Sequence, residues 1–185
     1  CDPALVYENY EGGSAKLDLC IELIQSAVES GHKILLFSQF TSMIEILTAR
    51  LQEESISCFV LQGSTKKEQR AQMVEQFNRD DTSVFCISLK AGGTGLNLTG
   101  ADIVIHYDPW WNVAVENQAT DRAHRIGQKN VVTVYKLIAK GTIEEKIIKL
   151  QQMKKELAEE ILSGDEIKTA SFQREELLEL LEERF

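Results

Sequence analysis

The sequence has no long hydrophobic run, no paired cysteines and only three histidines. Without a stretch of about 18 apolar residues we expect no membrane-spanning helix. The opening segment "CDPALVYENYEGG" lacks the basic and apolar regions of a signal peptide. It also lacks an initiator methionine, which suggests an excised fragment. The four cysteines form no Cys-x-x-Cys pair and the histidines have no metal-ligand spacing, so we expect reduced thiols and no metal site. The expected location is cytoplasmic, near the nucleoid in a bacterium, or nuclear in a eukaryote.

Two common nucleotide-binding motifs are also missing. A P-loop needs GxxxxGK[ST], and no Lys-Ser or Lys-Thr pair follows a suitable glycine. The dinucleotide fingerprint GxGxxG fails because Leu98 stands where a third glycine should follow Gly93 and Gly95. The sequence therefore excludes a triphosphate cradle and a Rossmann-type enzyme. The glycines of "LKAGGTGLNLTG" still allow either contact with an anion or a tight connection with positive φ angles.

Basic residues are fewer than acidic ones, and the net charge of −9 argues against a broad basic DNA-binding face. The charge is uneven along the chain. Residues 1–140 contain 13 basic and 17 acidic residues, whereas residues 141–185 contain 7 basic and 12 acidic residues. A local phosphate-binding surface in the first part remains compatible with this balance, and the acidic end is available as an interaction surface.

Helical and extended patterns alternate along the chain. Amphipathic helices are expected at 14–31, 41–54 and 63–80, and short apolar strands at 33–37, 57–61, 83–88, 101–107 and 131–138. This alternation predicts an α/β fold with a doubly wound, mainly parallel sheet flanked by helices. The last strand alternates more, which favours an edge position. Further helices are expected from residue 142 to Gly164 and over 171–185.

Local signals mark several helix ends. Ser14 is a candidate N-cap, Gly31 a helix terminator, and Thr65 with Glu68 a capping box. Thr142 with Glu145 forms a second capping box. Around Ser64 and Thr65, helix capping and phosphate binding are both compatible with the residues.

Ligands of parallel sheets collect at the carboxyl ends of the strands, which directs attention to residues 38–42, 61–65, 88–100 and 107–112. The last of these holds adjacent tryptophans, which point in opposite directions in an extended loop. We expect one of the two to pack inward and the other to be free to stack on or wedge into a nucleic acid, while for either residue taken alone a core anchor is also open.

Arg122 and Arg125 lie three residues apart, in what reads as the last turns of a helix. Like charges at this spacing repel mildly, so an anion should lie against them. Asp121 could pair with Arg125 for about 0.3–0.5 kcal/mol. A phosphate matches the rigid guanidinium fork better, and the stretch itself leaves both open.

A family resemblance extends over nearly the whole chain. The segments that carry it, in order, are "ILLFSQFTSMIEIL", "LQGST", "SLKAGGTGLNLT", "YDPWWNVAVENQATDRAHRIGQ" and "KGTIEEKI". In order and spacing they resemble the second motor lobe of SWI/SNF-type helicase-like ATPases, most closely the bacterial branch. The resemblance implies a RecA-like lobe over 14–140, the tail of an inter-lobe linker over 1–13, and a helical brace over 141–185.

The resemblance also implies two sets of site residues. Motif VI, Gln-x-x-x-Arg-x-x-Arg, matches Gln118, Arg122 and Arg125, so the arginines would be fingers for ATP and Mg²⁺ held mainly by an absent first lobe. Gly93 and Gly95 of motif V (Ser88 to Asn97) would also face the nucleotide. The implied contacts with double-stranded DNA are Ser38, Gln39, Gly63, Ser64, Thr65, Lys90, Ala91, Gly92, Trp111 and Asn112.

One residue departs from the family pattern, because the usual "DGST" box begins here with Gln62. We expect local hydrogen bonding to change more than DNA affinity. The expected partners are double-stranded DNA, ATP and the first lobe, with no membrane and a monomeric fragment that is inactive alone. The alternative is a DNA- or protein-docking module of the same fold that has lost its motor.

Overall fold

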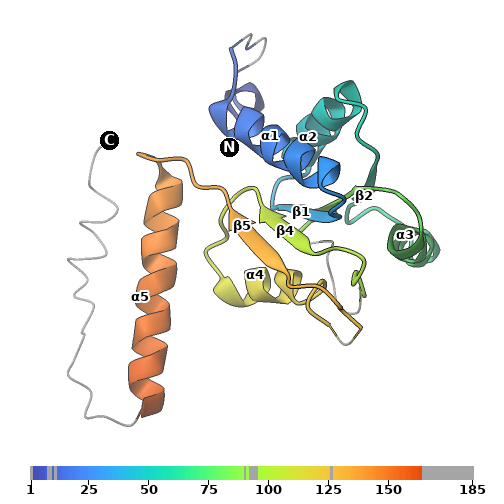
Figure 1. Ribbon diagram of the computed structural model, residues 1–185. Coiled ribbons are helices and arrows are strands. Elements are labelled where there is room, and N and C mark those ends of the chain that lie inside the picture. Colours follow the sequence, from blue (N-terminus) through green and yellow to red (C-terminus); the bar gives the residue numbers. More distant parts are fainter. Residues whose placement is uncertain are drawn as a thin grey trace.

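Five parallel strands form one sheet in the order β2-β3-β1-β4-β5 (Figure 1). The computed structural model describes residues 2–7, 10, 12–89, 91, 96–125 and 127–163, with the backbone alone for 157–163. The strands are β1 (Ile34–Ser38), β2 (Cys58–Leu61), β3 (Val84–Ser88), β4 (Ile103–His106) and β5 (Thr133–Lys136). The predicted parallel α/β sheet is confirmed, and so is the edge position of the last strand.

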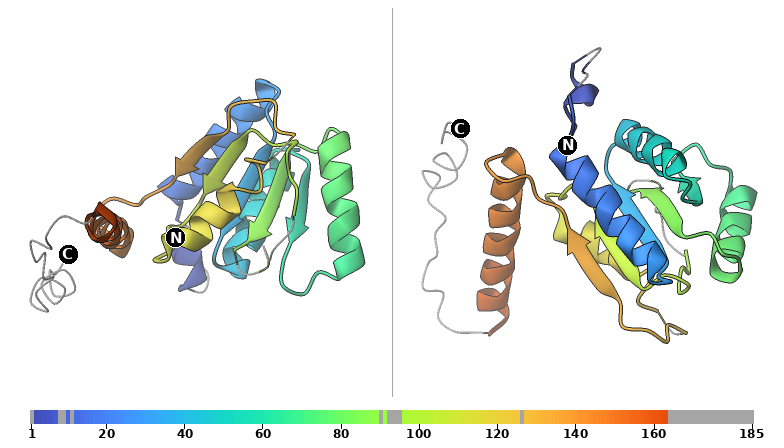
Figure 2. Two further views of the ribbon diagram at one scale, coloured as in Figure 1. Left: turned by 90° about the horizontal axis from the view of Figure 1, so that it is seen from below. Right: turned by 45° about the horizontal axis from the view of Figure 1, so that its top comes forward.

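Helices cover both faces of the sheet (Figure 2). One face carries α1 (Ala15–Glu29) and α2 (Thr41–Glu53), and the other carries α3 (Lys67–Arg79) and α4 (Val113–Thr120). A short 3-10 helix, Pro3–Leu5, precedes α1. The long helix α5 (Ile143–Ser163) stands on the β5 side of the sheet. The helix expected over 171–185 lies outside the described residues.

Alternating residues of the central strands feed two separate cores. In β1, Ile34 and Leu36 pack under α1 and α2, whereas Leu35 and Phe37 pack under α3 and α4. Side chains of a strand point to opposite faces in turn, so a strand covered on both faces needs apolar residues throughout. The continuous apolar runs that predicted these strands therefore reflect burial on both sides.

The expected helix caps are confirmed at both ends of α1. Ser14 Oγ accepts a hydrogen bond from the Leu17 amide at 3.4 Å, and Gly31 adopts a φ of 80° just after the helix. At α5, Thr142 Oγ1 accepts from the Glu144 amide, while Glu145 Oε2 accepts from the Gly141 amide at 2.8 Å. The predicted capping box is thus present in a variant that reaches one residue further back.

Candidate nucleotide and nucleic-acid site

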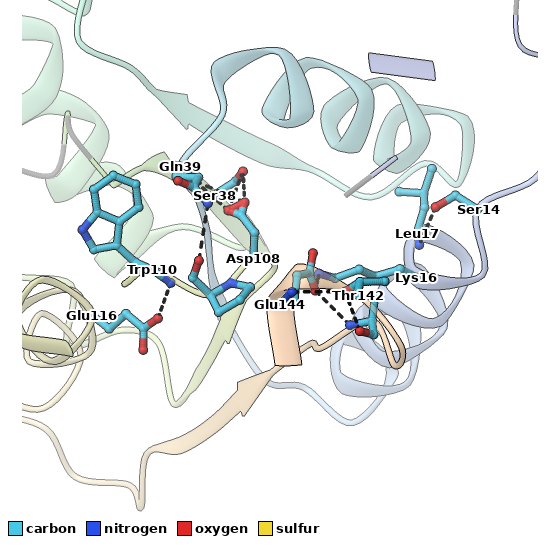
Figure 3. Close-up of polar contacts among 12 residues, drawn as sticks. Ser14, Lys16, Leu17, Ser38, Gln39, Asp108, Trp110, Glu116, Thr142 and Glu144 are labelled. Atoms are coloured by element: carbon cyan, nitrogen blue, oxygen red, sulfur yellow. Dashed lines mark hydrogen bonds and ion pairs between the residues drawn. The ribbon is translucent and has the colours of Figure 1, made fainter. Parts of the chain in front are cut away.

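The carboxyl ends of β1 and β4 are joined by a buried carboxylate. Asp108 accepts a hydrogen bond from Ser38 Oγ at 2.7 Å and from the Gln39 amide at 2.8 Å, across 70 and 69 residues of chain (Figure 3). Gln39 Nε2 also donates to the Pro109 carbonyl at 3.4 Å. Burial raises the pKa of Asp108, although the bonds from Gln39 and Ser38 oppose that rise. Two segments singled out in the sequence are therefore held together here.

Ser38 has a different role from the one the sequence suggested. Its side chain is completely buried and donates to Asp108, so it fixes the loop that carries Gln39 and does not present a surface hydroxyl. Gln39 is half-buried beside it. Contacts of this loop with a ligand would therefore come from Gln39 and from the exposed residues that follow it, Phe40 among them.

The turn after β2 is closed by its own threonine. Thr65 Oγ1 accepts a hydrogen bond from the Gln62 amide, and the Thr65 amide donates to the Gln62 carbonyl, both at 3.0 Å. The predicted capping box of Thr65 with Glu68 is therefore wrong, because the hydroxyl is already used inside the turn. The N-cap of α3 is Lys66, which makes no side-chain capping bond, so Ser64 and Thr65 are not caps either.

Arg70 holds this turn from α3. Its guanidinium donates to four backbone carbonyls, those of Gln62, Gly63, Thr65 and Ala91, at 2.8–3.3 Å. The Ala91 bond ties the turn after β2 to the loop after β3. A planar fork with five donors can make such a set, whereas a lysine ammonium cannot reproduce its geometry. Sequence reasoning missed Arg70, because nothing in the residues around a helical arginine indicates that its partners are backbone carbonyls of two loops.

We expect Arg70→Ala to lower the free energy of unfolding by about 1.5–3 kcal/mol, since hydrogen bonds to a charged group are lost. Amide hydrogen exchange should rise over residues 62–65 in particular. Urea denaturation and exchange measure both effects, with Gln72→Ala, an exposed change on the same helix, as the control. If Arg70→Ala matched the control in both measurements, the clamp would have no mechanical role.

The loop after β3 leads from the carboxyl end of β3 to the amino end of β4. At its start the Leu89 amide donates to the Ser38 carbonyl at 2.9 Å, and at its end the Leu98 amide donates to the Arg122 carbonyl at 3.0 Å. Ala91 is buried. The predicted site residues Lys90, Gly92, Gly93 and Gly95 lie outside the described residues. The two anchored ends nevertheless connect the carboxyl edge of the sheet with the turn that holds Arg122.

The adjacent tryptophans differ in burial, as expected, but the prediction that they point in opposite directions is wrong, because their ring centroids lie 5.9 Å apart. Trp110 is half-buried against the core under α3 and α4, whereas Trp111 is 56% exposed. Asn112 serves as the N-cap of α4, with Oδ1 accepting from the Ala114 amide at 3.1 Å. Of the two rings, only that of Trp111 presents most of its surface to a ligand.

Glu116 fixes the tryptophan loop from inside. This carboxylate is 1% exposed and accepts from the Trp110 amide at 2.6 Å, from Lys136 Nζ at 2.5 Å and from Gln151 Nε2 at 3.0 Å. One residue of α4 thereby joins the loop after β4, the strand β5 and the helix α5. The prediction from sequence did not include it, although a glutamate on the apolar face of a short helix was a signal.

The two arginines lie beyond the end of α4, in a turn. The prediction that they occupy the last turns of a helix is wrong, because α4 ends at Thr120 and the next residues form non-helical turns. Arg125 Nε donates to the carbonyl of Asp121 at 3.2 Å, a backbone contact in place of the expected carboxylate pair. Gln118 lies exposed on α4.

Arg122 and Arg125 differ in burial, and the positive charge of Arg125 acts on Arg122. Arg122 is 4% exposed and Arg125 is exposed. Burial, followed by repulsion from Arg125, lowers the pKa of Arg122 to about 10. Arg122 is nevertheless cationic at neutral pH, and burial and repulsion from Arg125 both disfavour this cation. An anion beside the pair would relieve both penalties, which is the chemistry of a phosphate site.

Gln128 braces the arginine turn with both ends of its amide. Nε2 donates to the carbonyls of Thr99, Ala101 and Ala123, the shortest at 2.7 Å, while Oε1 accepts from the amides of Lys129 and Asn130 at 2.9 Å. The turn is therefore held against the segment that enters β4. This residue too was missed as a site residue, because all its described partners are backbone groups, and two of them, Thr99 and Ala101, lie 29 and 27 residues away.

The described residues offer little for a metal or a membrane. Within them, no group of three or more His, Cys, Asp or Glu is arranged to hold a metal ion. Among the helices that the structure describes, none combines the length and apolar character needed to span a bilayer.

Comparison with known proteins gives consistent matches. The family model described as helicase conserved C-terminal domain matches residues 15–127. An uncharacterized ATP-dependent helicase of Mycoplasma pneumoniae is 47% identical over 170 residues, which cover 91% of this chain and 16% of that protein. The chromatin-remodeling ATPase INO80 of Homo sapiens is 43% identical over 169 residues, 91% of this chain and 11% of INO80. The chain thus spans less than a fifth of the length of these relatives.

A solved structure is similar as well. The C-terminal part of the Fun30 ATPase domain is 36% identical, with a TM-score of 0.73 over 79% of this chain and 48% of that one.

Proposed function

Because the chain belongs to the helicase conserved C-terminal domain family, among SWI/SNF-type ATPases, we propose that it is the second motor lobe of an ATP-dependent double-stranded-DNA translocase. The observation that carries the proposal is the arginine pair in the turn after α4. A buried guanidinium with a lowered pKa lies beside a second, exposed guanidinium, at the spacing Gln118-x-x-x-Arg122-x-x-Arg125. Such a pair suits the charge that develops in phosphoryl transfer.

On the nucleotide side, Arg122 and Arg125 would act as arginine fingers toward the γ-phosphate of ATP, with Gln118 near them. Mg²⁺ and most of the ATP would be held by a first lobe, which supplies the P-loop that this sequence lacks. The role of Gln128 would be to keep the arginine turn in place when the lobes close. Gly93 and Gly95 would also face the nucleotide, on the family resemblance alone.

On the DNA side, the contacts would come from loops along the carboxyl edge of the sheet. Gln39, the turn Gly63–Ser64–Thr65, Trp111 and Asn112 would meet the duplex backbone, with Lys90, Ala91 and Gly92 between them. Ser38 is assigned to positioning, because its hydroxyl is buried on Asp108.

The loop after β3 would couple the two sides. It is tied to Ser38 and Arg70 near the DNA-facing loops and to Arg122 and Gln128 near the arginine turn. A shift of the duplex against the DNA-facing end of this loop would therefore displace its other end, which is bonded to the arginine turn. We further propose the division into linker tail 1–13, RecA-like lobe 14–140 and brace 141–185, with the fragment monomeric.

Residues 1–185 alone should show no ATPase activity above background, with or without duplex DNA. A longer protein that adds the upstream first lobe should hydrolyse ATP and be stimulated by duplex DNA. A coupled ATPase assay on both proteins tests this. Turnover by the isolated chain that depends on Arg125, or an upstream sequence without GxxxxGK[ST], would contradict the motor.

The second candidate is a docking module of the same fold that binds DNA or protein without hydrolysis. The acidic segment 173–185, with five glutamates and two arginines, favours it as an interaction surface. The arginine pair favours the motor, because a module without ATP has no use for it.

A further inference from the structure

A pocket of about 350 Å³ lies between the start of α4 and the middle of α5. Trp111, Asn112 and Ala114 line one side, and Gln151, Lys154 and Lys155 line the other. Among the described residues no carboxylate lines it, although the whole chain has a net charge of −9. The pocket thus combines an aromatic ring with two ammonium groups, a composition that attracts an anion.

The α5 side of the pocket is fixed by a buried glutamine. Gln151 is 6% exposed and donates through Nε2 to Glu116 Oε1 at 3.0 Å and to the Trp110 carbonyl. Residues three and four positions further along a helix share its face. Docking Gln151 on the tryptophan loop therefore carries Lys154 and Lys155 to the pocket beside Trp111.

Lys154 and Trp111 are already in contact. Lys154 Nζ lies 5.3 Å from the centroid of the Trp111 ring, while the tryptophan remains 56% exposed. The ring can still offer surface to a sugar or a base with an ammonium held at its face. Proteins that track nucleic-acid strands combine cations for phosphates with aromatic surfaces for the adjoining groups.

We propose that this pocket binds one phosphodiester unit of a DNA strand, with Lys154 and Lys155 on the phosphate and Trp111 against the adjoining sugar or base. The inference rests on the proposed function and extends it, because it makes α5 part of the DNA-binding surface. The strand order β2-β3-β1-β4 lines up the turn after β2, the loop after β3, Gln39 and Trp111 along one edge. The pocket continues that row past β4.

The test is duplex DNA binding by the longer protein without nucleotide, measured by fluorescence anisotropy over a range of salt concentrations. Each phosphate contact contributes about 0.9 to the slope of log K against log salt. We expect Lys154→Gln with Lys155→Gln to weaken binding and to lower the slope by about one. Lys154→Arg should retain binding. Lys149→Gln, an exposed change elsewhere on α5, is the matched control and should have little effect.

Three outcomes would overturn the inference: unchanged affinity and slope in the double variant, an equal drop in the Lys149 control, or tighter binding. An equal drop in affinity would mean that the lysines of α5 attract DNA only through their overall charge. Tighter binding would mean that the lysines of α5 keep Trp111 from contacting DNA. Two comparisons distinguish failure of the inference from failure of the proposed function. If the wild type binds no duplex, the proposed function itself fails. If Trp111→Ala weakens binding while the lysine variants do not, only the inference fails.

Discussion

Arg125→Ala in the longer protein is expected to lower DNA-stimulated ATP hydrolysis by roughly a thousandfold while leaving duplex affinity unchanged. A finger that stabilises the charge of the transferring phosphoryl group contributes a factor of about 10³–10⁵. A thousandfold loss corresponds to about 4 kcal/mol of transition-state stabilisation. Steady-state ATPase rates at saturating duplex, with anisotropy measured on the same preparations, provide the test.

Arg125 gives a sharper test than its neighbour for a structural reason. Arg125 is exposed and contacts its own turn through Nε, so its removal should leave the fold intact. Arg122 is 4% exposed, and its replacement would disturb packing and catalysis together. Arg79→Ala is the matched control, because Arg79 is an exposed arginine that pairs with Glu75 on the surface of α3.

A small loss of activity in Arg125→Ala, comparable with that in Arg79→Ala, would contradict the finger assignment. The arginine pair would then serve the structure of the turn, and the docking module would become the better account of the chain. Loss of duplex affinity together with activity would instead move Arg125 to the DNA side of the lobe.

Much of the sheet could be predicted from the sequence because its signals are local. An apolar run such as "KILLF" identifies a strand covered on both faces, whatever its neighbours are. Ser14 and Gly31 act within a few residues of themselves, and both predicted caps are confirmed. The alternation of side chains in extended backbone did not carry over to Trp110 and Trp111, whose rings lie side by side with centroids 5.9 Å apart.

The residues that hold the candidate site together could not be predicted in this way. Within the described part of the chain, Arg70 and Gln128 bind backbone groups only, including carbonyls 21 to 29 residues away, and almost any residue type offers those groups. Thr65 was assigned to a helix cap because the capping pattern is local, but the turn after β2 uses its hydroxyl first. The early end of α4 has the same origin, since contacts with the β3–β4 loop outweigh the helical pattern at Arg122.

An ion pair joins the first helix to the last across 128 residues of chain. Lys16 Nζ, near the start of α1, lies 2.5 Å from Glu144 Oε2, and both side chains are over 90% buried (Figure 3). Glu144 also accepts from the Ala139 amide at 2.8 Å, and Lys16 lies over the ring of Tyr107. Burial works to raise the pKa of Glu144, but the bonds from Lys16 and Ala139 leave it below its ordinary value near 4.5. The carboxylate is therefore charged in the folded protein at neutral pH.

Breaking this pair from one side is expected to cost about 3–5 kcal/mol of unfolding free energy, because an uncompensated charge stays buried. Lys16→Met and Glu144→Gln should each show this loss in urea denaturation at neutral pH. At that pH the contribution of the ionised Glu144 to the unfolding free energy is fully present, because its pKa is lowered in the folded protein. The contribution is lost only as the pH falls through that lowered pKa. The double variant should cost less than the sum of the two, since it leaves neither charge behind. Arg50→Met, which breaks surface pairs with Asp18, Glu53 and Glu54, is the control and should cost about 0–1 kcal/mol. If Lys16→Met cost no more than Arg50→Met, α5 would be held on the lobe by other contacts, such as those of Gln151 with Glu116 and Trp110.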